Sequence, residues 1–104
     1  MGKPESKIET YLIKRAKKEG FFQCKFTSPG TDGVPDRMLI GYGYTFFIET
    51  KKSENENPRR LQKVMINDMI NHGGYVYVAG TKEEVDEILS SIKNGKPKKP
   101  EKQI

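Results

Sequence analysis

Apolar side chains recur along the chain at two periods, one typical of helices and one typical of strands. Ile8, Leu12 and Ala16 form a helical stripe over residues ~5 to 19, which Gly20 is expected to end as a C-cap. The same patterns predict strands at about 21 to 27, 36 to 41, 45 to 51 and 75 to 79, and helices from about 57 to 72 and from 81 onward. This alternation of helices and strands predicts a mixed α/β domain.

Polar residues and glycines mark where these elements begin and end. Asn57 is a suitable N-cap for the second helix, with Pro58 at its first position. Thr81 and Glu84 have the spacing of a capping box for the last helix. Between the second and third strands, the turn-forming residues 41–44 predict a hairpin.

Length and composition limit the possible classes of protein. A chain of 104 residues can bury one core without metal or disulfide staples. Cys24 is the only cysteine, so no intramolecular disulfide can form, and we expect a cytoplasmic protein. No apolar run reaches the ~20 residues that span a bilayer. Sequence motifs for nucleotide binding, zinc cysteine clusters and acyl transfer are missing, so no nucleotide cofactor is expected.

The net charge of +5 is concentrated near the end of the chain. Residues 1–93 are expected to form the folded domain, and 94–104 a flexible basic tail, because this segment has few apolar residues to bury. Its lysines either keep the protein soluble or contact nucleic-acid phosphates without sequence preference. Lys96, Lys98 and Lys99 are the candidate phosphate contacts.

Charged residues stand where the apolar run of the third strand should continue. Because side chains alternate along a strand, Glu49 and Lys51 share one face, and an antiparallel neighbour would bring Asp36 close to both. Two carboxylates with water and the backbone carbonyl of Thr50 would satisfy a magnesium ion. A divalent ion neutralises a phosphodiester and activates water, so this pattern favours metal-dependent phosphodiester hydrolysis, assisted by the lysine.

The order Gly33-Val34-Pro35-Asp36-Arg37, hairpin, Glu-x-Lys and then a helix with a glutamine resembles the VRR-NUC nucleases of the PD-(D/E)XK superfamily. The resemblance covers roughly residues 5 to 80. It implies a restriction-endonuclease-like core of order αβββαβ, with a central mixed sheet flanked by helices. It also implies that Asp36, Glu49 and Lys51 are catalytic, with Mg²⁺ or Mn²⁺ as cofactor.

Further candidates combine periodicity with this resemblance. Glu9 lies on the apolar face of the first helix, where it either forms a salt bridge or joins the carboxylates as a metal ligand, with Glu5 as a competitor for that role. Gln62 faces partly inward. It is either a hydrogen-bonded polar residue at the edge of the core or, as the resemblance implies, the glutamine near the active site that positions water or a phosphate. Lys25 is either a phosphate contact, as in family members, or a solvated strand lysine.

The resemblance finally implies a substrate and an assembly. Small stand-alone members of the family occur in phages and mobile elements, and form homodimers that suit branched DNA such as four-way junctions. We therefore expect a DNA endonuclease. The alternative is a DNA-binding or regulatory protein that keeps the nuclease fold and has lost turnover.

Overall fold

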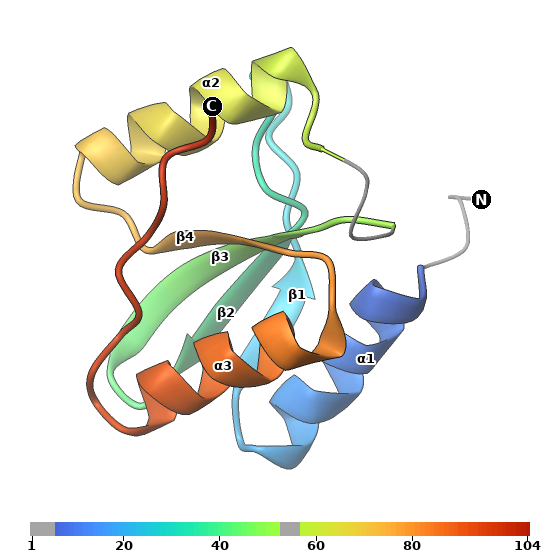
Figure 1. Cartoon of the computed structure of the whole chain (residues 1–104), viewed down its shortest axis with the longest axis vertical. Helices are drawn as coiled ribbons and strands as arrows, with labels where there is room; N and C mark the ends of the chain where they lie inside the picture. Colours follow the sequence, from blue (N-terminus) through green and yellow to red (C-terminus); the bar gives the residue numbers. More distant parts are fainter. Residues whose placement is uncertain (1–5, 53–56) are drawn as a thin grey trace.

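The computed structural model describes residues 6–52 and 57–104, which form a four-stranded sheet between helices (Figure 1). The sheet order is β1-β2-β3-β4, in which the first three strands are antiparallel and β4 runs parallel to β3. The elements are α1 (Lys7–Lys18), β1 (Phe22–Lys25), β2 (Arg37–Gly41), β3 (Tyr44–Thr50), α2 (Arg60–Asn71), β4 (Val76–Ala79) and α3 (Lys82–Lys93). The predicted element order and the mixed sheet are thus confirmed.

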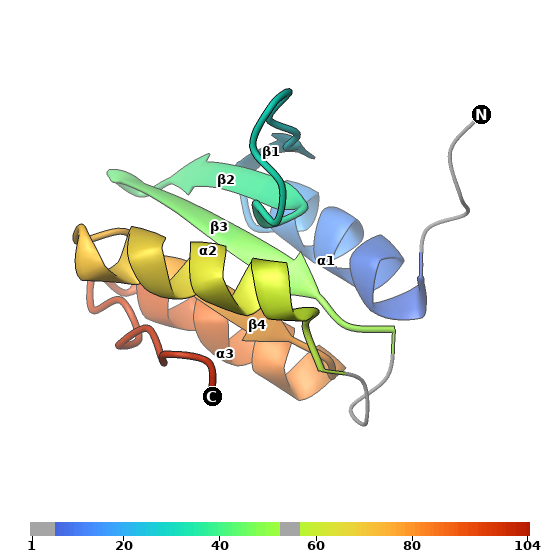
Figure 2. The ribbon, with the colours of Figure 1, turned by 90° about the horizontal axis from the view of Figure 1, so that it is seen from above.

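The helices form two layers, with α1 and α3 on one face of the sheet and α2 on the other (Figure 2). Alternation along β2 and β3 turns Leu39, Phe46 and Ile48 toward α1 and α3, where each is fully buried. The α3 stripe meets them with Val85, Ile88, Leu89 and Ile92. The main core therefore lies between the sheet and these two helices.

Local signals act as expected at several turns. Gly20 follows α1 with a φ of +86°, a left-handed conformation that costs glycine little, so it ends the helix. Tyr42 and Gly43 both have positive φ, which matches the type I′ turn that joins twisted antiparallel strands. At α3, the Thr81 hydroxyl accepts a hydrogen bond from the Glu84 N–H at 3.1 Å, as the capping box predicts.

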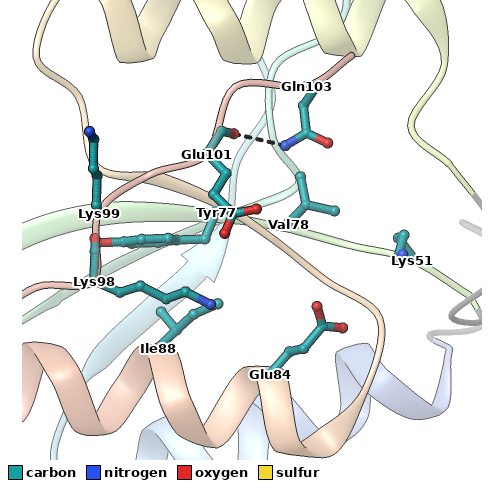
Figure 3. Close-up of a pocket in the computed structure, with 9 residues that line it drawn as sticks. All are labelled: Lys51, Tyr77, Val78, Glu84, Ile88, Lys98, Lys99, Glu101 and Gln103. Carbon is teal, nitrogen blue, oxygen red and sulfur yellow. Dashed lines mark hydrogen bonds between the residues drawn. The ribbon is translucent and has the colours of Figure 1, made fainter.

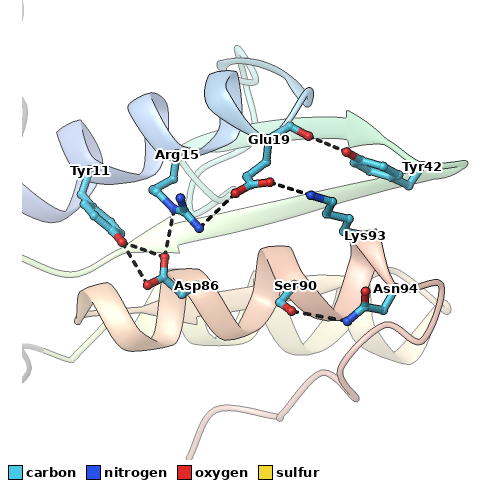
Figure 4. A network of polar contacts seen from close by, with 8 residues as sticks. All are labelled: Tyr11, Arg15, Glu19, Tyr42, Asp86, Ser90, Lys93 and Asn94. Atoms are coloured by element: carbon cyan, nitrogen blue, oxygen red, sulfur yellow. Dashed lines mark hydrogen bonds and ion pairs between the residues drawn. The ribbon is translucent and has the colours of Figure 1, made fainter.

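Polar side chains also join α1 to α3 (Figure 4). Asp86 accepts hydrogen bonds from the Tyr11 hydroxyl at 2.7 Å and from Arg15 Nε at 3.2 Å. Lys93 Nζ lies 2.8 Å from Glu19 Oε2. These contacts lie at the rim of the core, where solvent weakens ion pairs, so they fix the helix pairing more than they add stability.

Two predicted boundaries were wrong. The second helix begins at Arg60 with Arg59 as its N-cap, rather than at Asn57 and Pro58. The first strand is shorter than residues 21 to 27, because Phe21 leaves the strand pattern to pack edge-on against Phe46. The course of the preceding loop sets the start of α2, and a tertiary contact sets the start of β1. Local sequence propensity predicts neither.

The segment after α3 differs from the expected flexible tail. It lies along the body of the domain, where the Lys96 N–H donates to the Ser91 carbonyl at 3.0 Å and the Tyr77 hydroxyl donates to the Lys98 carbonyl at 2.7 Å. Composition missed this because backbone groups, rather than apolar side chains, make the attachment. None of the helices in residues 6–52 and 57–104 has the length and apolar character that crossing a membrane requires.

Candidate active site

The antiparallel pairing of β2 and β3 brings two acidic side chains together. Asp36 directly precedes β2, and Glu49 lies near the end of β3, in the register that pairs Arg37 with Ile48. The backbone N–H of Asp36 donates to Glu49 Oε1 at 3.1 Å. This contact joins two residues that are thirteen positions apart in the sequence.

Neighbouring groups hold both carboxylates in place. Thr50 donates to Asp36 through its hydroxyl at 2.9 Å and through its backbone N–H at 3.3 Å. From α2, Gln62 Nε2 donates to Glu49 Oε2 at 2.9 Å. The oxygen of the same amide accepts from the Arg59 N–H at 3.0 Å, which fixes the orientation of the amide. Thus Thr50 of β3 positions the carboxylate of Asp36, and Gln62 of α2 positions that of Glu49.

Burial makes both acids unusually reluctant to ionise. Burial, and then the negative charge of Asp36, raise the pKa of Glu49 to about 7. Burial is also the main cause of the raised pKa of Asp36, to which the charge of Glu9 adds. The hydrogen bonds from Thr50 and Gln62 oppose these shifts. A cation at this place would relieve the repulsion between the acids.

Glu9 of α1 forms an ion pair with Arg37, the residue that follows Asp36. Glu9 Oε2 lies 3.0 Å from Arg37 Nε, and Arg37 also donates to the Gln23 side-chain oxygen at 3.1 Å. The guanidinium is buried, with 7% of the residue exposed. Glu9 therefore forms the salt bridge that was one of its two predicted roles, and its charge helps to raise the pKa of Asp36, whereas its role as a metal ligand stays a prediction.

These groups line a cavity of about 600 Å³, which we call the acidic cavity. Three cationic side chains stand around it, on β1, after β3 and before α2. The lining residues are Ser6, Glu9, Lys25, Asp36, Glu49, Thr50, Lys52, Asn57, Arg59 and Gln62. An acidic floor with a basic rim can hold a cation and attract an anion at the same time.

Lys51 lies elsewhere in the structure. Strand β3 ends at Thr50, and the backbone N–H of Lys51 still donates to the Ala79 carbonyl at 2.8 Å, which keeps Lys51 beside the end of β4. Its side chain instead passes over Gly80, where a Cβ would collide with the lysine Cε. It lines a separate cavity of about 240 Å³ together with Glu84 (Figure 3). Among the described residues, the lysine on the rim of the acidic cavity after β3 is Lys52.

The residues present suit a hard divalent cation. Each oxygen of Asp36 and Glu49 accepts one of the hydrogen bonds above, and an ionised carboxylate offers about four lone-pair positions. Across residues 6–52 and 57–104 no group of three or more His, Cys, Asp or Glu could hold a metal ion. Such a donor set is poor for zinc, whereas magnesium commonly uses one or two carboxylates and keeps several waters.

The predicted phosphate contacts on the last segment of the chain do not line the acidic cavity. Lys98 Nζ pairs with Glu87 Oε1 on α3 at 3.2 Å, and Lys96 and Lys99 are exposed on the segment after α3. Glu5, the competitor of Glu9, lies outside the described residues.

Sequence reasoning did not identify several groups of the site. The hydroxyl of Thr50 was not considered, because strand alternation places it on the face opposite Glu49. The role of Arg37 as the buried partner of Glu9 follows from that same alternation, which turns it toward α1. For Lys52 and Arg59 the sequence carries no signal beyond their proximity to the motif.

Comparisons with known proteins show what the whole chain is similar to. No family model matches the chain. A protein of Acyrthosiphon pisum secondary endosymbiont phage 1, named "Putative nuclease p44", is 38% identical over 61 residues, which cover 57% of this chain and 66% of that protein. A solved structure described as a VRR_NUC domain superimposes with a TM-score of 0.74 at 27% identity, over 80% of this chain and 90% of that one. These matches show a restriction-endonuclease-like fold like that of the VRR_NUC domain and, with the order of the motifs, support a VRR-NUC nuclease.

Proposed function

We propose that this protein is a DNA endonuclease that requires Mg²⁺ or Mn²⁺. The observation that carries the proposal is the pairing of the half-buried carboxylate of Asp36 with the buried carboxylate of Glu49, each with a raised pKa. Buried acids of this kind are costly unless they serve a function or bind a cation. The phage relative, which is named as a nuclease, and the VRR_NUC fold support the same class of activity, and the relative favours action inside a host cell.

In this proposal Asp36 and Glu49 would hold the metal, together with the carbonyl of Thr50. When bound, the metal would neutralise charge on the phosphodiester and lower the pKa of a bound water. The hydroxyl of Thr50 keeps the Asp36 carboxylate oriented, and Gln62 does the same for Glu49. Because these contacts exist without a metal, the carboxylates need little rearrangement on binding it.

The cations around the acidic cavity would bind the phosphates of the DNA. Lys25, Lys52 and Arg59 line the cavity, so they can contact the strand that is cut. Lys51 of the Glu-x-Lys motif is retained as the cation that offsets charge in the transition state. From its observed place beside Gly80, it would have to turn toward the cavity to do so.

Cleavage assays with defined metals test the proposal. Linear, nicked, flapped and four-way DNA would be incubated with Mg²⁺, Mn²⁺ or a chelator. We expect cleavage with either metal and none with chelator, and loss of cleavage in Asp36→Asn. Asp68→Asn is the matched control, because that aspartate is exposed on α2 beside His72. Undiminished cleavage by a folded Asp36→Asn protein would refute the site.

We further propose that the active form is a homodimer that acts on branched DNA. On the sheet face that α2 covers, strands β1 and β2 present Phe22 and Ile40, which are cross-strand partners and are 55% and 41% exposed. Alternation places Cys24 and Met38 next to them on the same face. Neighbouring exposed apolar side chains favour an interface, and a twofold axis would use this surface twice.

Sedimentation measurements test the assembly. Phe22→Ser should shift the protein from dimer to monomer, whereas Val64→Ser, at a similarly exposed position of α2, should not. A wild-type protein that sediments as a monomer at tens of micromolar and still cuts four-way DNA in paired incisions would refute the dimer.

The position of Lys51 favours one alternative, a protein that binds DNA without turnover. In that case the Asp36 and Glu49 pair would bind a cation for structural reasons. DNA affinity that depends on Lys25 and Arg59, without cleavage of any substrate in either metal, would support this alternative and reject the endonuclease.

A further inference from the structure

The segment of residues 97–103, which we call the strap, connects the two helical layers across the edge of the sheet. It leaves α3 and runs past β4 to α2 (Figure 1). At its beginning, the Lys98 N–H donates to the Ser91 hydroxyl at 3.0 Å, and the Lys98 carbonyl accepts from the buried Tyr77 hydroxyl at 2.7 Å. The strap is therefore fixed to α3 and β4 before it reaches α2 (Figure 3).

At α2, among the described residues, Asn67 makes two hydrogen bonds to the strap, and Lys63 Nζ donates to the carbonyl of the following residue, Ile104, at 2.8 Å on the exposed surface. Asn67 Oδ1 accepts the backbone N–H of Gln103 at 2.6 Å, and Asn67 Nδ2 donates to the Gln103 carbonyl at 2.8 Å. Both hydrogen-bonding ends of the amide are thus used on one residue of the strap. Asn67 is half-buried, so water competes only partly for these bonds.

This attachment matters because the apolar contacts of α2 are few. Among its residues only Ile66 is buried, whereas α3 buries four side chains. A helix with so small an apolar anchor can shift or open more easily than the rest of the domain. The same helix carries Gln62, whose amide donates to Glu49. Any displacement of α2 would therefore move a group that orients the candidate site.

We propose that the strap holds α2 in place and that Asn67 is a positioning residue, which acts on Glu49 through α2 and Gln62. Its effect on cleavage rests on the proposed nuclease function, whereas its effect on α2 does not. The segment that composition describes as a basic tail is, in this proposal, part of the framework of the site.

Hydrogen exchange on the metal-free protein tests the structural half. Asn67→Ala should speed the exchange of the α2 amides by about tenfold, because two hydrogen bonds are lost, while the amides of α3 keep their wild-type rates. Asn71→Ala, at the exposed end of the same helix, is the matched control. Asn67→Asp keeps the acceptor for the Gln103 N–H and should give an intermediate rate. It also serves as the test variant if Asn67→Ala does not fold. Wild-type exchange rates in α2 of the Asn67 variants would overturn the proposal.

A double-mutant cycle tests the path to the site. Mn²⁺ affinity by calorimetry and the cleavage rate at saturating DNA would be measured for Asn67→Ala, Gln62→Ala and the double variant. We expect Asn67→Ala alone to weaken Mn²⁺ binding several-fold relative to the wild type. In a protein that already carries Gln62→Ala, adding Asn67→Ala should have no further effect on Mn²⁺ affinity. Equal losses in both backgrounds would overturn the path through Gln62. If the wild type neither binds Mn²⁺ nor cleaves DNA, the proposed function fails, and the exchange rates still decide the role of the strap.

Discussion

Replacing Glu49 with glutamine should stabilise the metal-free protein above neutral pH, although it should abolish cleavage. Burial raises the pKa of Glu49 from the ordinary 4.5 to about 7. Between these two values the folded protein holds a proton that the unfolded chain has released, so the free energy of unfolding falls as the pH rises through this window. Above about pH 7 the free energy of unfolding falls no further on account of Glu49, because its carboxylate is then ionised in both the folded and the unfolded chain.

The size of the effect follows from the two pKa values. A difference of about 2.5 pH units corresponds to about 3 kcal/mol of lost stability at pH 8. Glutamine avoids this cost because it carries no charge. It gives up one hydrogen bond, however, since its side-chain amide cannot accept from both Asp36 N–H and Gln62, which costs about 1 kcal/mol. The expected net gain is about 2 kcal/mol, or roughly 10 °C in melting temperature for a domain of this size.

Thermal unfolding at pH 5 and pH 8 with chelator measures this gain. The variant should melt above the wild type at pH 8, and the difference should shrink toward zero at pH 5. Adding Mg²⁺ at pH 8 should raise the melting temperature of the wild type and leave the variant unchanged. Glu101→Gln, at an exposed position, controls for the general effect of removing a negative charge. A variant that melts at or below the wild type at pH 8 would refute the conclusion that the ionised Glu49 strains the fold.

Four other substitutions separate structural from functional roles. Arg37→Met should lower the free energy of unfolding by about 2 kcal/mol in urea titrations, because it removes the buried guanidinium that pairs with the half-buried Glu9 carboxylate; a loss below 1 kcal/mol would contradict this. Lys52→Met should weaken DNA binding, whereas Lys51→Met should lower the cleavage rate at saturating DNA; the reverse result would assign the motif's role to Lys52. Thr81→Ala should cost about 1 kcal/mol through loss of the α3 N-cap, and an unchanged urea midpoint would rule this out.

The sequence alone determined the element order, the hairpin and the pairing of Asp36 with Glu49. The element order and the hairpin depend on local signals, which are the two periods of apolar residues and the glycines at turns. The pairing of Asp36 with Glu49 then follows because, in an antiparallel hairpin, the start of β2 lies beside the end of β3. The capping box at Thr81 is equally local, because donor and acceptor lie three residues apart. Such signals can be read from the sequence because the interacting groups lie close together along the chain.

Only the tertiary structure decided which charged groups share a cavity and where the last residues lie. The side chain of Lys51 lies across Gly80, whereas Lys52 lines the acidic cavity, and strand alternation could not foresee either position. The strap is held by backbone hydrogen bonds to Ser91, Tyr77 and Asn67, and every residue can supply such groups, so composition carries no trace of them. The raised pKa of Glu49 likewise depends on burial, which the folded chain creates by packing α2 against the sheet.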